Sequence, residues 1–496
     1  MKKLVYIPSG LPTPEFEILL SKCQEILDTK KDNLVIVTYS KDAKAPCPFN
    51  LYSQKSIYSA SQSKLDKGLA QLKGNFKLIS VPDINWRKNK LTEFEKKNIT
   101  NKKKIKDLNY KKIDIGLSSW ATYLDGTRDL NLDGYFSKSL MLRIFKSSKS
   151  LVNNFEKILK NEKINEIFMY NGRRHNTRPL LRLANKKRIK LQNLEHVTFL
   201  NNTKGVRQFK NFMPNDLIFL KKEIMRHWNK NRGNDEDVKK YFLYRKNNLL
   251  KNNQASHVFN QSKTLLPDNW NENKINIVYF ISSQDEYAAN GGEWFNSVYK
   301  DQNYSLVKIS KDFLKKNVEN KYHLWIRIHP YLKGVKWKFN TDMFKFSEFK
   351  NIDVIKPESP ISTYRLMEKC DKVLGYHSIT TVEANFWRKP SMLLGRQYFE
   401  NMNCCHRANN HQDVIDFIFS NKHKLKPKIN SLKIASFWIH GGINQKYFGG
   451  NMLKGYKFNN KQFKLNFFYR FQFYYGKLLE KFFYNKINYY LRNFKF

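Results

Sequence analysis

Short apolar runs alternate along this chain with stretches whose apolar residues recur at helical spacing, and this alternation constrains the fold more than any other feature. Runs too short for a helix, each closed by polar or turn-forming residues, are typical of strands buried on both faces of a sheet. Strands that alternate with helices form parallel βαβ units. The expected strands are residues 4–8, 34–38, 76–81, 166–170 and 191–194 in the first half, and 275–281, 323–328, 352–355, 372–375 and 391–394 in the second.

The polar, asparagine-rich stretch 229–273 separates these two series and lacks a strong apolar period, so we place the connection between two domains there. A chain of 496 residues is long enough for two or three domains. The charged stretch 86–112 is interpreted as a solvated loop. The prediction is an α/β protein with two Rossmann-like, doubly wound domains, covering residues 1–245 and 270–430, followed by a basic aromatic helical tail over 455–496.

The chain carries 90 Lys and Arg against 43 Asp and Glu, a net charge of +47, which favours an anionic partner. Nucleotides, phospholipid surfaces, acidic glycans and nucleic acids all qualify, and AT-biased coding sequence also raises the Lys content, so charge alone does not choose among them. The five cysteines form no CxxC pair, which argues against a zinc site or disulfide scaffold and fits a reducing cytoplasm. The first apolar run is too short for a signal peptide. No apolar run approaches the roughly 20 residues that span a bilayer.

Residues 461–496 combine fifteen Phe or Tyr with eight Lys or Arg and a single acid, Glu480. Such a segment can lie in a bilayer interface, with aromatic rings at the headgroup boundary and cations on anionic lipid. The alternative is a terminal helix packed on the first domain, whose aromatic residues belong to the core. Both interpretations can hold for different faces of one helix.

In residues 323–329, period-two alternation puts Trp325, Arg327 and His329 on one side of a strand that must stop at Pro330. His329 therefore lies at the carboxyl end of a strand, where its ring can donate a hydrogen bond to a phosphate or leaving-group oxygen. A histidine that caps a turn is the alternative interpretation.

The strand at 372–375 leads through Ser378 into a helix expected to begin near Thr380 or Thr381. Unpaired amides and the partial positive charge at a helix start can hold a phosphate, and the three hydroxyl groups add donors. Glu383 could then accept hydrogen bonds from ribose hydroxyls. Helix capping between Thr380 and Glu383 is the commoner use of this spacing.

The segment Ser282-Ser283-Gln284-Asp285-Glu286 follows the first strand of the second series, so it should reach the same edge of that sheet. Its hydroxyls can bind phosphate or sugar, and one of its carboxylates can act as a general base on an acceptor hydroxyl. An ordinary polar loop that caps the next helix is the competing interpretation.

In the first domain, Asn171, Arg173 and Arg174 occupy another strand end and are expected to face the site from the opposite wall. Glu195, at the end of the next strand, is an equal candidate for the base. Asp125 is a third candidate, although Asp-Gly is usually a turn.

One set of motifs follows a fixed order through the chain: Ser282-Ser283-x-Asp285-Glu286, Ile328-His329-Pro330, Ser359-Pro360-x-x-x-Tyr364-x-Leu366-Met367, Asp371-x-Val373, Ser378-x-x-Thr381-x-Glu383-Ala384, Pro390 and Gly395, preceded by Asn171-Gly172-Arg173 and Glu195. This set resembles bacterial capsule polysaccharide biosynthesis proteins, which are glycosyltransferases of the GT-B type. The resemblance is strongest over residues 275–400 and weaker over 168–195.

The resemblance implies two domains facing each other across a cleft, with the donor nucleotide in the second and the acceptor mainly on the first. By likeness to relatives that transfer Kdo or sialic acid, His329 and Ser378 would bind the donor phosphate, and a CMP-activated sugar is one candidate donor. The acidic base motif of sialyltransferases is matched only by Leu124-Asp125-Gly126, which leaves the base unassigned. GT-B transferases generally need no bound metal, so neither a metal nor another cofactor is expected.

The sequence therefore predicts a cytoplasmic glycosyltransferase, peripheral on the inner face of a bacterial cytoplasmic membrane. It would move a sugar from a nucleotide-sugar donor onto a capsular or other surface polysaccharide or its lipid anchor, with residues 461–496 meeting anionic lipid. The rival is a non-catalytic basic protein that binds polyanions or nucleic acid, for which no RNP, helix-turn-helix or zinc signature is present. The expected catalytic residues are Asp285, Glu286 and His329; the nucleotide-sugar ligands are Ser282, Ser283, Arg327, His329, Ser378, Thr380, Thr381 and Glu383; and the acceptor side of the cleft is Asn171, Arg173, Arg174 and Glu195.

Overall fold

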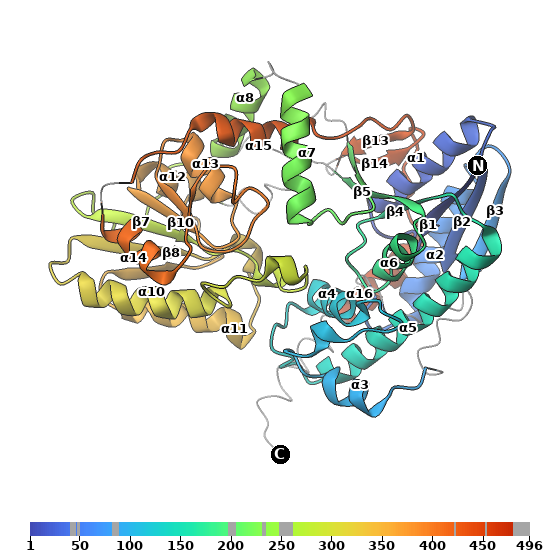
Figure 1. Cartoon of the computed structure of the whole chain (residues 1–496), viewed down its shortest axis with the longest axis horizontal. Coiled ribbons are helices and arrows are strands. Elements are labelled where there is room, and N and C mark those ends of the chain that lie inside the picture. Colours follow the sequence, from blue (N-terminus) through green and yellow to red (C-terminus); the bar gives the residue numbers. More distant parts are fainter. Residues whose placement is uncertain are drawn as a thin grey trace.

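Two six-stranded sheets, each covered by helices on both faces, form two domains that lie next to each other (Figure 1). The structure is a computed structural model, and it describes residues 1–39, 46, 50–81, 89–196, 205–230, 235–247, 261–420, 423–451 and 454–479.

The first sheet has the strand order β3-β2-β1-β4-β5-β6. All neighbouring strands are parallel except the last pair, in which β6 runs antiparallel to β5. The edge strand β6 was missed in the sequence because its apolar residues are few. The strands are β1 (Lys2–Ile7), β2 (Asn33–Tyr39), β3 (Phe76–Val81), β4 (Glu166–Tyr170), β5 (Lys190–His196) and β6 (Val206–Lys210).

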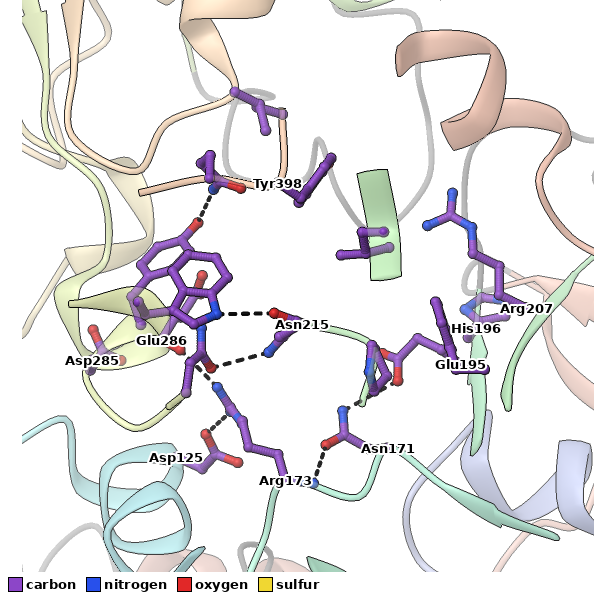
Figure 2. Close-up of a pocket in the computed structure, with 18 of the residues that line it drawn as sticks. Asp125, Asn171, Arg173, Glu195, His196, Arg207, Asn215, Asp285, Glu286 and Tyr398 are labelled. Atoms are coloured by element: carbon purple, nitrogen blue, oxygen red, sulfur yellow. Dashed lines mark hydrogen bonds and ion pairs between the residues drawn. The ribbon is translucent and has the colours of Figure 1, made fainter. Parts of the chain in front are cut away.

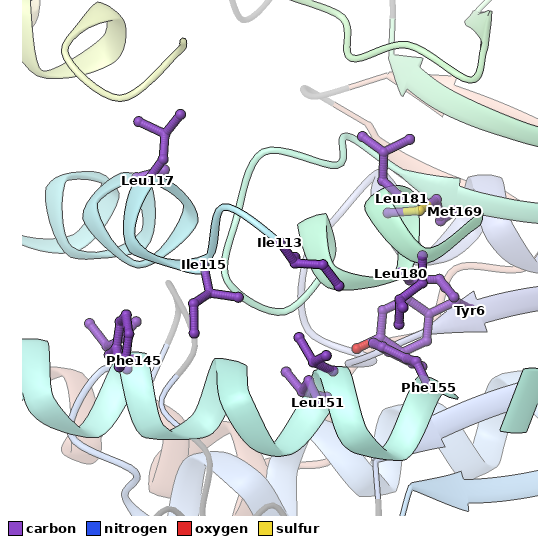
Figure 3. Close-up of a cluster of buried hydrophobic side chains, with 14 of the residues drawn as sticks. Tyr6, Ile113, Ile115, Leu117, Phe145, Leu151, Phe155, Met169, Leu180 and Leu181 are labelled. Atoms are coloured by element: carbon purple, nitrogen blue, oxygen red, sulfur yellow. The ribbon is translucent and has the colours of Figure 1, made fainter. Parts of the chain in front are cut away.

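Alternate residues of β1 point to the two faces of this sheet. Leu4 and Tyr6 belong to one buried cluster, and Val5 and Ile7 belong to another, so the strand is apolar throughout because both faces are covered. Figure 3 shows the first cluster, in which Phe155 of the long helix α5 packs against Tyr6 of β1, with 5.1 Å between the ring centroids. The helices of this domain are α1 (Glu15–Asp28), α2 (Lys55–Leu69), α3 (Glu93–Asn98), α4 (Ile115–Thr127), α5 (Ser137–Glu162) and α6 (Arg178–Lys186).

The second sheet is parallel throughout and has the order β12-β11-β10-β7-β8-β9. Numbered within its own domain, each sheet reads 3-2-1-4-5-6, the strand order of the doubly wound Rossmann fold. The predicted fold class is confirmed. The strands are β7 (Ile275–Phe280), β8 (Tyr322–Arg327), β9 (Ile352–Ile355), β10 (Lys372–Gly375), β11 (Ser391–Leu393) and β12 (His406–Arg407).

The alternation predicted along β8 is present. Leu324 and Ile326 pack in one core cluster and Trp325 in a second cluster on the other face of the sheet. The helices of this domain are α9 (Gln284–Tyr287), α10 (Gln302–Lys316), α11 (Lys338–Thr341), α12 (Thr363–Lys369), α13 (Thr380–Phe386) and α14 (His411–Phe419), with the 3-10 turns η4 (Gly292–Trp294), η5 (Pro330–Leu332) and η6 (Asp342–Glu348).

The chain crosses to the second domain earlier than the expected boundary at residue 245. Helices α7 (Leu217–Lys230) and α8 (Asp235–Lys246) pack with α15 (Lys428–His440) against the second sheet's helices, in one buried cluster. The crossing therefore lies between β6 and α7 (Figure 1). The amphipathic pattern of α7 does not reveal which domain its apolar face covers. Residues 248–260 of the predicted connection lie outside the described residues.

After α15 the chain returns to the first domain. Ile443 forms a bridge with Val206, and the hairpin of β13 (Phe448–Asn451) and β14 (Gly455–Phe458) packs against α1. Helix α16 (Phe467–Leu479) then lies against α2. Residues 480–496 of the tail lie outside the described residues.

The charged stretch 86–112 is not a solvated loop where the structure describes it, from residue 89 onward. Thr92 and Glu95 form a capping box that starts α3, and a 3-10 turn, η2 (Ile105–Asp107), follows. Ile99, Ile105 and Leu108 are buried in the main core of the first domain. The prediction was wrong because these apolar residues stand singly among lysines, without a period that marks a buried face.

Replacing Ile105 by Ala should lower the free energy of unfolding by about 2 to 5 kcal/mol, because it removes a fully buried side chain and leaves a cavity. Lys104→Ala, next to it and exposed, should change the free energy by less than about 0.5 kcal/mol. Urea unfolding of both variants measures the difference. Equal, small effects would mean that this stretch is solvated after all.

Candidate active site between the two domains

In each sheet the strand order reverses between the first and fourth strands, β1 and β4 in one domain and β7 and β10 in the other. Connections from two such strands leave toward opposite faces of the sheet, which opens a crevice at their carboxyl ends. Loops from both crevices line one cavity of about 660 Å³. Figure 2 shows Glu195 and Arg207 on one side of this cavity and Asp285 and Glu286 on the other.

The first-domain wall is shaped by a left-handed turn after β4. Asn171 and Gly172 have φ values of 66° and 85°, and a Cβ on Gly172 would lie 2.7 Å from the Asn193 amide. The Asn171 side chain accepts a hydrogen bond from the Arg173 amide at 3.1 Å and donates one to Glu195 Oε2 at 3.2 Å. One asparagine thus positions both the arginine and the carboxylate.

Two adjacent arginines on this wall share one carboxylate. Arg174 Nε lies 2.9 Å from Asp125 Oδ2, and its Nη1 lies 3.0 Å from Glu15 Oε1. Arg173 pairs with the other Asp125 oxygen. Asp125 lies in the last turn of α4, not in a free turn, and both its oxygens are engaged, so it is a poor candidate for a base.

Glu195 has an unusual protonation equilibrium. Burial, together with the nearby charge of Glu15, raises the pKa of Glu195 to about 7, although the hydrogen bond from Asn171 acts in the opposite direction. Burial also lowers the pKa of His196 to about 4, so this ring is neutral at pH 7.

Arg207 of β6 completes this wall. Its Nη2 donates to the backbone carbonyls of Phe437 and Trp438, each at 3.0 Å, and its guanidinium lies 4.4 Å from the Phe437 ring centroid. Burial lowers the pKa of Arg207 to about 10, so it remains charged at neutral pH.

The second-domain wall begins at the end of β7. Ser282 donates to the carbonyl of Tyr376, and Ser283 donates to Asp285 Oδ1 at 2.8 Å, so both hydroxyls hold the loop in place. The Glu286 carboxylate is open to the water of the cavity but crowded by protein, and this desolvation, with the charge of Asp285, raises the pKa of Glu286 to about 7.

An aromatic group lies beside these acids. The Tyr287 ring is stacked on His377 with 4.7 Å between centroids, and Trp294 lies 5.2 Å from Tyr287. Burial lowers the pKa of His377 to about 4. Tyr287 and Trp294 line the cavity, which therefore has a flat apolar surface next to its charged loops.

Side chains of the first domain reach across to the second. Arg173 Nη1 donates to the Glu286 carbonyl at 2.8 Å, and Arg128 Nη1 donates to the Tyr331 carbonyl at 2.6 Å. The Arg128 guanidinium also lies 3.8 Å from the Tyr331 ring centroid and 3.8 Å from Asp285. These contacts hold the two walls together around the cavity.

The segment that crosses between the domains closes another part of the cavity. The Asn215 carbonyl accepts a hydrogen bond from Trp294 Nε1 at 3.0 Å, and its side chain bonds to Asn290 at 3.2 Å. Two doubly wound domains thus face each other through their switch points. The protein has a GT-B fold.

Comparisons with known proteins give matches of low identity and low TM-score only. No family model matches the chain, and no curated protein matches it. A solved KpsC β-Kdo 2,4-transferase from Thermosulfurimonas dismutans is 10% identical with a TM-score of 0.36, over 55% of this chain and 80% of that one. The UDP-GlcNAc 2-epimerase of Methanocaldococcus jannaschii, solved with UDP-GlcNAc and UDP, is 12% identical with a TM-score of 0.27, over 88% and 98%. The fold assignment therefore rests on the strand order and the shared cavity of this chain.

Part of the expected site lies in the cavity wall. Neither Ser282 nor Ser283 lines it: the Ser282 hydroxyl donates to the Tyr376 carbonyl, and the Ser283 hydroxyl donates to Asp285. The expected residues that do line the cavity are Asn171, Arg173, Arg174, Glu195, Asp285 and Glu286.

Arg327 and Glu383 are not placed to contact a nucleotide, which corrects the expectation for both. Arg327 is 1% exposed and donates to backbone carbonyls, at 2.6 Å to that of Lys356. Glu383 is also 1% exposed and pairs with Arg245 of α8 at 2.6 Å. Each charge is compensated inside the second domain, by partners that are distant in sequence.

The hydroxyls after β10 form hydrogen bonds within their own segment. Ser378 Oγ lies 2.8 Å from Thr380 Oγ1, and Thr381 Oγ1 donates to the Ser378 carbonyl at 3.0 Å. His329 Nδ1 accepts a hydrogen bond from the Tyr331 amide at 3.1 Å, so it caps a turn, and it does not line the cavity. Ile379 and Tyr331, their neighbours, do line it.

Several cavity residues were missed in the sequence. Arg128 follows α4 in a left-handed conformation, and Arg207 lies on the unrecognised strand β6. The aromatic residues of the cavity wall follow no sequence period that predicts a binding surface: Phe209, Tyr287, Trp294, Tyr331, Tyr398, Phe437 and Trp438. Within the described ranges, no group of three or more His, Cys, Asp or Glu side chains is placed to hold a metal ion.

Replacing Glu195 by Gln should raise the melting temperature more at pH 8 than at pH 5. The pKa of Glu195 is higher in the folded chain than its ordinary value of 4.5. The stability that the protonated side chain contributes is therefore fully present below pH 4.5 and is lost as the pH rises through about 7. Glutamine removes this loss. Differential scanning fluorimetry at both pH values measures the change.

Glu348→Gln, at an exposed carboxylate, is the control and should shift the melting temperature equally little at both pH values. A Glu195→Gln shift that does not depend on pH would contradict the raised pKa.

Proposed function

We propose that the protein is a glycosyltransferase that moves a sugar from a nucleotide-sugar donor onto a glycan or glycolipid of the cell surface. The observation that carries this proposal is the cavity that two facing switch points share, with a carboxyl group of raised pKa on each wall. The donor binds to the second domain and the acceptor to the first.

Transfer requires a base that takes the proton from the acceptor hydroxyl as the new bond forms. A base works best when its pKa lies near the operating pH, and both Glu195 and Glu286 meet that condition. Glu195 already accepts a hydrogen bond from Asn171, whereas the Glu286 carboxylate accepts no hydrogen bond from the described residues and is open to the cavity. We therefore assign the base to Glu286, with Asp285 beside it raising its pKa.

The leaving nucleotide gains negative charge on its phosphate as the bond to the sugar breaks. Arg128 and Arg173 come from the first domain but end beside the Asp285–Glu286 loop of the second, where they can stabilise that charge. Because both cross the interface, this arrangement is complete only when the domains are closed. The rings of Tyr287 and Trp294 offer a surface on which a nucleobase can stack.

Binding of a nucleotide-sugar should raise the melting temperature of the protein, because a ligand that binds only the folded state stabilises it by mass action. At a hundredfold excess over Kd the gain is about 2.7 kcal/mol. A thermal-shift screen of CMP-, UDP- and GDP-sugars, repeated with Arg128→Ala, identifies the donor nucleotide. The variant should show a smaller shift.

Product analysis with the identified donor separates two reactions that the names of the solved structures suggest. Release of the nucleotide with extension of an acceptor supports transfer, and an isomerised sugar supports epimerisation instead. Absence of any shift, combined with DNA binding that falls steeply with salt, would favour the rival polyanion-binding protein.

Glu286→Gln should lower kcat by about 10² to 10⁴, the range that general base catalysis contributes. In the wild type, kcat/KM should rise with pH up to about 7 and then level off, because only the ionised carboxylate accepts the proton. The variant should lose this rise. Steady-state rates between pH 5 and 9 measure both effects.

Glu293→Gln is the matched control, since Glu293 is exposed, close in sequence and absent from the cavity wall. Its rate and pH profile should stay as in the wild type. If Glu195→Gln abolished turnover and Glu286→Gln did not, the base would lie on the first-domain wall.

A further inference from the structure

Helix α16 exposes a continuous apolar stripe to solvent. Its large side chains recur at spacings of one, three and four residues, which places them on one face of the helix. The opposite face packs on α2, and Gln54 Nε2, just before α2, donates to the Gly476 carbonyl at 2.9 Å. The stripe consists of Phe467 (86% exposed), Phe468 (60%), Phe471 (61%), Tyr474 (59%), Tyr475 (52%) and Leu478 (61%).

The stripe is too large to be incidental. With about 200 Å² for each side chain, its exposed surface is on the order of 700 Å². The largest apolar patch on a typical monomer is about 300 to 600 Å². Large exposed patches of this kind mark sites where a protein meets a membrane or another macromolecule.

The charges around the stripe indicate what kind of surface it binds. Residues 461–479 contain no acid, and their basic residues are Lys461, Lys464, Arg470 and Lys477. A second copy of the chain would bring one such basic patch against another, since a twofold interface uses the same surface on both subunits. An anionic lipid surface is complementary to both the cations and the mixed Phe and Tyr side chains, which favour the headgroup boundary.

We propose that α16 docks the protein on an anionic membrane surface, with its apolar stripe in the headgroup boundary and Lys464 and Arg470 on lipid phosphates. The helix lies in the plane of the interface. At 13 residues it is about 20 Å long, and no helix among the described residues is long and apolar enough to cross a bilayer.

The position of α16 relates this surface to the cavity. Helix α2 follows the carboxyl end of β2, and Gln54, which precedes α2, contacts Gly476 of α16. The carboxyl ends of the strands form the edge of the sheet at which the cavity opens. If the proposed transferase function holds, a lipid-linked acceptor in that membrane lies on the same edge as the acceptor wall.

Sedimentation with vesicles tests the docking surface on the full chain. Wild-type protein should sediment with phosphatidylglycerol vesicles and stay in the supernatant with pure phosphatidylcholine. Replacing Phe467, Phe471 and Leu478 together by Ser should weaken binding at least about a hundredfold, because three large apolar side chains no longer leave water. Circular dichroism checks that the variant stays folded.

The matched control replaces three exposed apolar side chains elsewhere, Phe94, Val307 and Val318, by Ser. This variant should sediment like the wild type. If the control loses as much binding as the α16 variant, the surface is not specific, and the proposal fails.

The basic residues are tested separately. Lys464→Gln with Arg470→Gln should weaken binding to the anionic vesicles about fivefold for each charge, and added salt should weaken wild-type binding. Lys315→Gln with Lys316→Gln, on the exposed end of α10, is the control and should have little effect.

The proposal is overturned if the wild-type protein never sediments with anionic vesicles, or if the apolar variant sediments as well as the wild type. It is also overturned if light scattering shows that the wild type is a dimer and that the apolar variant is not. Transfer to a soluble acceptor distinguishes the two proposals. If the docking proposal fails, the wild type and the apolar variant still transfer sugar to the soluble acceptor at the same rate. If the transferase assignment fails, neither protein shows any transfer, but the wild type still binds vesicles.

Discussion

The reversal of strand order at the middle of each sheet is the constraint on which the rest of this molecule depends. Parallel strands need crossover connections, and connections that wind in both directions from a central pair must leave toward opposite faces. Each domain therefore has an unfilled crevice at the carboxyl ends of β1 and β4 or of β7 and β10. The two domains place these crevices opposite each other, and neither wall alone encloses a substrate.

Burial and neighbouring acids determine the electrostatics of the site. The pKa values of Glu195 and Glu286 rise because burial removes favourable hydration and because a neighbouring acid, Glu15 or Asp285, repels the negative charge. Carboxylates or backbone carbonyls surround the arginines of the two walls.

The chain passes between the domains twice, and both passages matter for function. Helices α7, α8 and α15 anchor the second domain, while β13, β14 and α16 return to the first. This exchange fixes Asn215 and Arg207 at the cavity and leaves α16 on the outside of the first domain with its apolar face uncovered. The first passage thereby contributes residues to the cavity, and the second places α16 on the surface of the first domain.

The sequence alone determined the strands and their polar ends, because buried parallel strands must be short apolar runs and their carboxyl ends must carry the ligand-binding groups. Asn171, Glu195 and Glu286 were found in this way. Only the tertiary structure decided which charges face the cavity: Arg327 and Glu383 turn inward to partners on distant segments, while Arg128 and Arg207 enter the site from elements with no clear pattern. The direction in which a charged side chain points depends on the neighbours that folding brings together, and those neighbours lie far apart in the sequence.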